Sequence, residues 1–167
     1  PEAVALLQDK SREKKRIRII GDYDADGICS SYILKRGLEA CGAVVDTMIP
    51  HRMKDGYGLN EHLVDEAYAD GIDTILTCDN GIAAYAQIEQ AKKYGMTVIV
   101  TDHHEIPYEE EPLAEPDPET GETSRRRYKI PPADVVIDPK QPGDTYPFQE
   151  ICGAVVAFKL MQLLFAE

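Results

Sequence analysis

The sequence has few cysteines, and their spacing excludes two common uses of this residue. The four cysteines lie far apart, without a CxxC pair, at positions 29, 41, 78 and 152. Zinc knuckles and small disulfide-stabilised domains need closely spaced cysteines. We therefore expect a reducing, cytoplasmic environment, in which Cys29, Cys41 and Cys152 are core thiols on helices.

Long apolar runs are missing as well. The longest candidate, residues 151–165, is interrupted by Lys159, and no segment resembles a signal peptide. We therefore expect no contact with a membrane. A length of 167 residues with 43% hydrophobic content suits one globular domain. No GxGxxG or P-loop pattern is present, which argues against a metal-free Rossmann-like nucleotide binder.

Basic residues are too few to balance the acids, and the formal net charge is −12. Residues 105–122 carry eight acids and no base, so most of this charge is local. Further acids lie in the three clusters described below, where bound divalent cations would reverse the local sign and attract phosphate. The acidity is therefore compatible with a nucleic-acid substrate.

Short β-rich runs alternate with helical patterns, which predicts an α/β fold. The expected architecture is a mostly parallel sheet with helices on both faces, and Asn60 is the expected N-cap of a helix at 61–69. After an amphipathic start at 2–15, strands are expected at 16–20, 43–49, 72–77, 96–101 and 133–137, and helices at 28–40, 61–69, 82–94 and 149–165. Residues 105–132 are interpreted as an exposed excursion, such as a hairpin, in which Arg125–Arg127 provide a counter-charge to the acids.

Three of the expected strands end in side chains that favour metal ions. The clusters are GDYDADG at 21–27, CDNG at 78–81 and DHHE at 102–105. Ligands of α/β sheets bind beyond the carboxyl ends of the strands, so the clusters should meet in space. Carboxylates with histidine and no thiolate favour Mn²⁺ or Mg²⁺. The candidate metal ligands are Asp22, Asp24, Asp26, Asp79 and His103.

The number of candidate ligands predicts two ions. Four to six ligands from three strand ends exceed what one octahedral ion needs, and paired ions about 4 Å apart serve phosphoryl transfer. Taken singly, Asp26-Gly27 and Asn80-Gly81 are ordinary turn formers. An EF-hand is discounted because no glutamate stands at the closing position of the loop. Together the clusters predict metal-dependent hydrolysis of a phosphate ester.

The motifs GDYDADG, TCDNGI and TDHHE, in this order at strand ends, resemble motifs I to III of the DHH phosphoesterase superfamily. The DHH triplet is Asp102-His103-His104. GYGLN at 56–60 and CGAVVAFKL at 152–160 extend the similarity toward the single-strand-specific 5′→3′ DNA exonucleases of this superfamily. The resemblance implies a Rossmann-like DHH domain, two bound Mn²⁺ or Mg²⁺ ions, single-stranded DNA as substrate, and a role in DNA repair and recombination.

The resemblance also implies roles for individual residues. Asp24 would bind one ion, Asp26 and His103 the other, and Asp79 both. Other superfamily members carry a histidine where this chain has Ile20, so the first ion would depend more on Asp22 as an additional ligand or hydrogen-bond acceptor. The implied catalytic residues are Asp79, His103 and His104.

Substrate contacts are expected at three positions. His104 would hydrogen-bond the scissile phosphate, with Asp102 orienting a neighbouring histidine. Arg52 is a candidate for a backbone phosphate and Tyr57 for stacking on a base. A solvated loop charge and a packing residue are the competing interpretations of the last two.

The resemblance further implies that residues 1–167 are the N-terminal part of a DHH domain in a longer protein. A fourth motif with another aspartate, a DHHA1 domain and an OB module would lie outside this chain, and the activity of the isolated chain is left open. Two other functions remain open: a phosphodiesterase acting on short RNA or small nucleotides, and a non-catalytic Cdc45-like replication scaffold. The presence of Asp24, Asp26, Asp79 and His103 together argues against a scaffold. Other repair proteins are possible partners.

Overall fold

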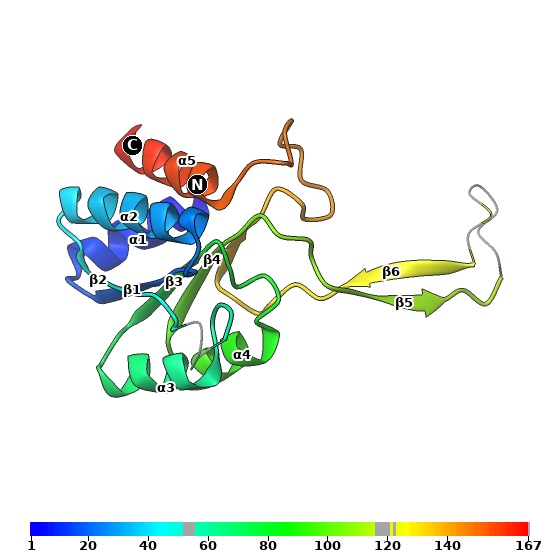
Figure 1. The fold of residues 1–167 in the computed structure, drawn as a ribbon, viewed down its shortest axis with the longest axis horizontal. Helices are drawn as coiled ribbons and strands as arrows, with labels where there is room; N and C mark the ends of the chain where they lie inside the picture. The colour runs from blue at the N-terminus through cyan, green and yellow to red at the C-terminus, as the bar shows by residue number, and fades with distance from the viewer. Residues whose placement is uncertain (52–55, 116–120, 122, 167) are drawn as a thin grey trace.

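A five-stranded parallel sheet forms the centre of the computed structural model, which describes residues 1–51, 56–115, 121 and 123–166. The strand order is β2-β1-β3-β4-β7, and every pairing in this sheet is parallel (Figure 1). The strands are β1 (Arg16–Ile20), β2 (Val44–Met48), β3 (Thr74–Cys78), β4 (Thr97–Thr101) and β7 (Val135–Ile137). The predicted parallel α/β architecture is confirmed.

Helices cover both faces of the sheet, as predicted (Figure 1). Each face has its own apolar core, one beneath α1, α2 and α5 and the other beneath α3 and α4. The helices are α1 (Glu2–Arg12), α2 (Ala25–Ala40), α3 (Glu61–Ala69), α4 (Tyr85–Lys93) and α5 (Gly153–Ala166). In the described part of the chain, no helix has the length and apolar character needed to cross a membrane.

Element boundaries follow the local capping chemistry. Asn60 is the N-cap of α3, and its side chain accepts a hydrogen bond from the amide of Leu63, as expected. The fourth helix starts three residues later than predicted, because a turn from Gly81 to Ala84 precedes it. The fully buried β3 is the middle strand, and β4, predicted to be central, is interior between β3 and β7.

The prediction of core thiols is wrong at all three cysteines for which it was made. Cys29, Cys41 and Cys152 are exposed, and Cys78 on β3 is buried. On α2 the inward face consists mainly of small residues, including Gly27, Ser30, Ser31 and Gly37. Helical spacing alone did not reveal which face of α2 packs on the sheet.

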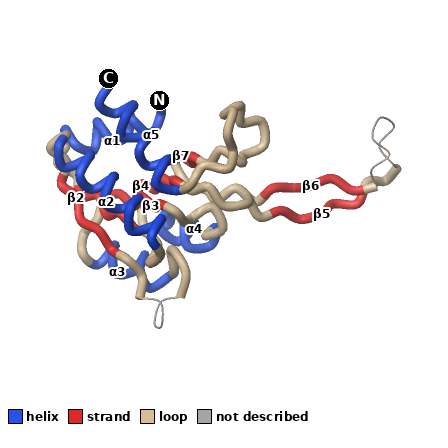
Figure 2. The backbone as a smooth tube through the Cα atoms, turned by 45° about the horizontal axis from the view of Figure 1, so that its top comes forward, coloured by secondary structure: helices blue, strands red, loops and turns tan. Residues whose placement is uncertain are grey.

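The acidic excursion contains a two-stranded antiparallel ribbon, β5 (Tyr108–Pro112) and β6 (Ser124–Tyr128). It projects away from the sheet and its helices (Figures 1 and 2). Glu111 accepts hydrogen bonds from Arg125 and Arg127, and Arg126 lies 4.6 Å from the centre of the Tyr108 ring. Arg125 and Arg127 therefore pair with an acid across the ribbon, as predicted from the sequence.

The central strand should dominate the stability of the sheet that carries the strand-end clusters. Leu76→Ala, at a fully buried position of β3, is expected to lower the free energy of unfolding by about 2–5 kcal/mol through lost burial and a residual cavity. Val44→Ala, at a 42% exposed position on the edge strand β2, should cost about 1 kcal/mol or less. Urea unfolding of the two variants tests this, and equal losses would contradict the assignment of the core.

Candidate metal centre

The first cluster forms the turn from β1 into α2. Asp24 is the N-cap of α2, and its carboxylate accepts a hydrogen bond of 2.9 Å from the amide of Gly27. A Cβ at residue 27 would lie 2.5 Å from the carbonyl oxygen of Asp22, so the turn requires glycine there. The tight turn buries Asp22, which is 1% exposed, at the end of the sheet.

The second cluster follows the middle strand. Asp79 is 2% exposed and has a φ of 59°, in the left-handed region that residues other than glycine rarely adopt. The neighbouring Asn80 donates to the carbonyl oxygens of Ile20 and Cys78, and its own side-chain oxygen accepts from the amide of Leu59. Asn80 thus ties the ends of β1 and β3 to the loop before α3 and fixes the backbone that carries Asp79.

The third cluster is organised by the buried carboxylate of Asp102. One of its oxygens accepts from the amide of Ile82, and the other from the amide of His103 and from Nδ1 of His104, at 2.8 and 2.7 Å. Burial favours the protonated acid, but these hydrogen bonds outweigh it and hold the pKa of Asp102 below its usual value. The same pairing raises the pKa of His104. The structure therefore places a charged carboxylate behind the imidazole of His104.

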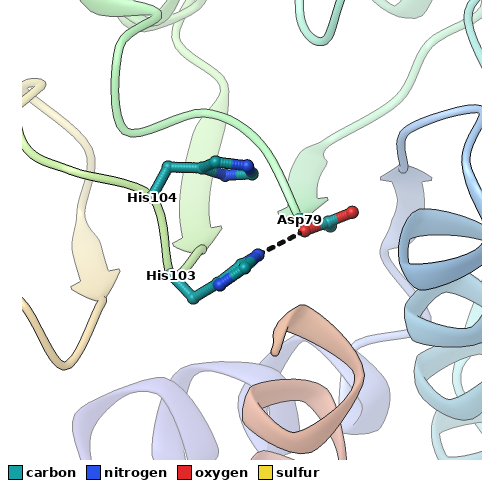
Figure 3. Close-up of side chains that lie close together, drawn as sticks. All are labelled: Asp79, His103 and His104. Atoms are coloured by element: carbon teal, nitrogen blue, oxygen red, sulfur yellow. Dashed lines mark hydrogen bonds and ion pairs between the residues drawn. The ribbon is translucent and has the colours of Figure 1, made fainter. Parts of the chain in front are cut away.

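The three clusters meet around Asp79. Nε2 of His103 lies 2.9 Å from Oδ1 of Asp79 and 3.5 Å from Oδ2 of Asp26, and both histidines point toward Asp79 (Figure 3). Among the described residues, two groups of three potential ligands have their ligand atoms within 4.8 Å of one another, and Asp79 belongs to both. The groups are Asp79, His103 and His104, and Asp22, Asp24 and Asp79. The structure thus brings together all five residues predicted as metal ligands.

Burial and neighbouring negative charges raise the pKa of two acids in this cluster. Burial, followed by the charges of Asp26 and Asp24, raises the pKa of Asp79 to about 8. Burial also raises the pKa of Asp22, whose Oδ1 is buried and has no hydrogen-bond partner among the described residues. A bound cation would satisfy that oxygen and offset the repulsion. A donor set of carboxylates and imidazole, without thiolate, fits Mn²⁺ or Mg²⁺.

Besides His104, the candidate substrate contact Tyr57 lies at this centre. Its hydroxyl is 3.2 Å from Nε2 of His104 and 3.2 Å from the carbonyl oxygen of Asp79, and its ring meets Tyr23 and His104 edge to face. Burial, followed by the charge of Asp102, raises the pKa of Tyr57. Arg52 lies outside the described residues.

Two features of the site were missed in the sequence. Asp138 directly follows β7, is 1% exposed, and has a pKa raised by burial to about 6. Because it follows a strand like the other acids, the strand-end rule could have identified it. The amides of Gly153 and Ala154 at the start of α5 donate to the carboxylate of Asp26. Backbone donors leave no signal of this kind in a sequence.

Comparisons with known proteins agree with the geometry. Residues 16–167 match the family described as "DHH family, N-terminal domain". The chain is 39% identical over 166 residues to the single-stranded-DNA-specific exonuclease RecJ of Bacillus subtilis, covering 99% of this chain and 19% of that protein. This chain thus spans about a fifth of the length of that relative.

Solved structures show the same fold. A crystal structure of exonuclease RecJ bound to manganese superposes with a TM-score of 0.78 at 38% identity, over 99% of this chain and 37% of that chain. CDC45 from Entamoeba histolytica shares the fold alone, with a TM-score of 0.53 at 13% identity over 99% of this chain and 29% of the other. The chain therefore belongs to the DHH family, and its resemblance to RecJ exonucleases, predicted from the strand-end motifs, is confirmed.

Proposed function

We propose that this chain is the N-terminal part of the DHH domain of a two-metal phosphodiesterase, which degrades single-stranded DNA from the 5′ end in repair and recombination. The position of Asp79 is the main support for two ions, because Asp79 belongs to both groups of potential ligands. The similarity to RecJ proteins over nearly the whole chain supports the substrate. A cytoplasmic location and contacts with other repair proteins remain predictions.

The residues that would hold the metal ions divide on either side of Asp79. Asp22 and Asp24 form one group with Asp79, and His103, which lies 3.5 Å from Asp26, belongs to the other. Bound Mn²⁺ or Mg²⁺ would polarise the phosphate and lower the pKa of a bound water. The unpartnered Oδ1 of Asp22 supports its assignment as a ligand in this chain, where Ile20 takes the place of a histidine.

His104 is placed to hold the scissile phosphate. Its Nδ1 is fixed by Asp102, so a substrate would meet its Nε2, which in this structure lies 3.2 Å from the Tyr57 hydroxyl. The His104 side chain is 45% exposed. The raised pKa of His104 favours the imidazolium, which donates a charge-assisted hydrogen bond to a phosphate oxygen. Asp102 therefore keeps the imidazole oriented and charged, and His104 neutralises part of the charge that develops on the phosphate.

Tyr57 is the second proposed substrate contact. Tyr57 is 54% exposed beside His104, within reach of a nucleotide whose phosphate lies against that histidine. Aromatic side chains bind single strands by stacking on bases of any sequence. A phosphate contact from Arg52 remains a prediction.

Two alternatives use the same fold. A phosphodiesterase on short RNA or small nucleotides would need the same residues around Asp79, so a comparison of substrates must separate it from the DNA exonuclease. A Cdc45-like scaffold would have no use for buried carboxylates that repel one another. The raised pKa of Asp79 shows that retaining this cluster costs the metal-free protein free energy at neutral pH, which favours a metal-binding enzyme.

Calorimetric titration with Mn²⁺ should show up to two bound ions, and Asp79→Asn should abolish tight binding because Asp79 serves both ligand groups. Glu89→Gln is the matched control, since Glu89 lies on α4 and pairs with Lys93 at the surface. Tight binding that survives Asp79→Asn would refute the shared-ligand assignment.

The pKa of Asp79 predicts how metal-free stability depends on pH. Between pH 3.8 and about 8 the folded protein keeps a proton that the unfolded chain releases, so the Asp79 contribution to the free energy of unfolding falls as the pH rises. Asp79→Asn removes this contribution and should become progressively more stable than the wild type. Urea unfolding with chelator at several values between these limits measures the difference, and a constant difference would contradict the raised pKa.

In the full-length protein, Asp79→Asn should lower kcat/KM on a 5′-phosphorylated single-stranded DNA by on the order of 10³-fold, because several kcal/mol of charge stabilisation are lost. Glu89→Gln should leave the rate unchanged. Degradation should start at the 5′ end and be faster on DNA than on RNA of the same length. Faster cleavage of short RNA or of dinucleotides would favour the alternative substrate class, and an inactive wild type would favour the scaffold.

A further inference from the structure

We infer that the N-terminus of α5 is a positioning part of the metal centre, with Gly153 as its positioning residue. This inference rests on the proposed function, because Asp26 is one of the metal ligands proposed there. The amides of Gly153 and Ala154 donate to Asp26 over 2.7 and 2.8 Å, one to each carboxylate oxygen. Two bonds to different oxygens fix both the position and the rotation of this carboxylate.

The contact joins parts of the chain that are 127 and 128 residues apart. Asp26 lies in the first turn of α2, and its carboxylate provides partners for two of the amides that the start of α5 leaves unbonded. The positive end of the α5 dipole also faces the negative charge of Asp26. Before any cation binds, α5 therefore offsets part of the repulsion between Asp26 and the other carboxylates.

Glycine is required at position 153 because α5 approaches Asp79 closely. A Cβ on residue 153 would lie 2.8 Å from Oδ1, 2.9 Å from Cβ and 3.0 Å from Cγ of Asp79. Asp79 has little room to move, since it is buried and its Oδ1 is hydrogen-bonded to His103. Figure 3 shows the α5 ribbon, in salmon, next to Asp79. A side chain at 153 would therefore push α5, with its two donors, away from Asp26.

A second close contact holds α5 against α2 farther from the metal centre. A Cβ on Gly37 of α2 would lie 2.3 Å from Sδ and 2.7 Å from Cγ of Met161 on α5. Substitution at Gly37 thus disturbs the same helix pair without touching Asp26 or Asp79. Gly37 offers a matched control that separates loosening of α5 from loss of the contact at the metal centre.

The test compares Gly153→Ala with Gly37→Ala in the full-length protein, using Mn²⁺ calorimetry and the thermal midpoint of the metal-free protein. Groups that orient metal ligands typically change metal affinity by about 10–100-fold. We expect Gly153→Ala to weaken Mn²⁺ binding by at least about tenfold and Gly37→Ala to leave it nearly unchanged, although both lower the midpoint. Equal weakening by the two variants, or none by Gly153→Ala, would overturn the inference.

Should Gly153→Ala fail to fold, Ala154→Pro provides the second variant. It deletes one donor to Asp26, and proline is tolerated in the first turn of a helix. Weaker Mn²⁺ binding by this variant supports the inference, and wild-type affinity overturns it. A wild-type protein that binds no Mn²⁺ would instead remove the proposed function, so the two failures are distinguishable.

Discussion

Repulsion among carboxylates held at one edge of a parallel sheet is the constraint on which this site depends. The topology brings the ends of β1, β3 and β4 together, and the tight turns beyond them bury Asp22 and Asp79 close to Asp24 and Asp26. Among the described residues, backbone amides and imidazole offset part of this repulsion before a cation binds. The Gly27 amide donates a hydrogen bond to Asp24, the α5 amides donate to Asp26, and His103 is hydrogen-bonded to Asp79.

These compensations divide the cluster into two environments that share Asp79. Asp22 and Asp24 remain on one side, with an unpartnered oxygen on Asp22, and His103 and Asp26 lie on the other under the start of α5. Asp102 stands apart because its hydrogen bonds go to His104 and to backbone amides. We therefore propose two separate roles. The carboxylates around Asp79 hold the cations, and His104, which Asp102 supports, faces the phosphate.

The alternation of strands and helices was sufficient to predict the parallel sheet with helices on both faces. The strand-end motifs were sufficient to predict that five candidate ligands converge, because the ends of parallel strands meet at one edge of the sheet. The sequence did not indicate which side chains of α2 face the sheet, so Cys29 was wrongly assigned to the core. The α5 amides on Asp26 were equally hidden, since they depend on tertiary packing and not on residue type. Asp138 was overlooked although it follows a strand.

We propose that three strand ends form one centre in which Asp79 is shared by two ions. Anomalous diffraction from crystals of the full-length protein soaked in Mn²⁺ tests this arrangement. We expect two peaks about 4 Å apart at the Asp79 carboxylate, one toward Asp24 and the other toward His103. A single ion that does not contact Asp79, or no ordered ion at this edge of the sheet, would contradict it.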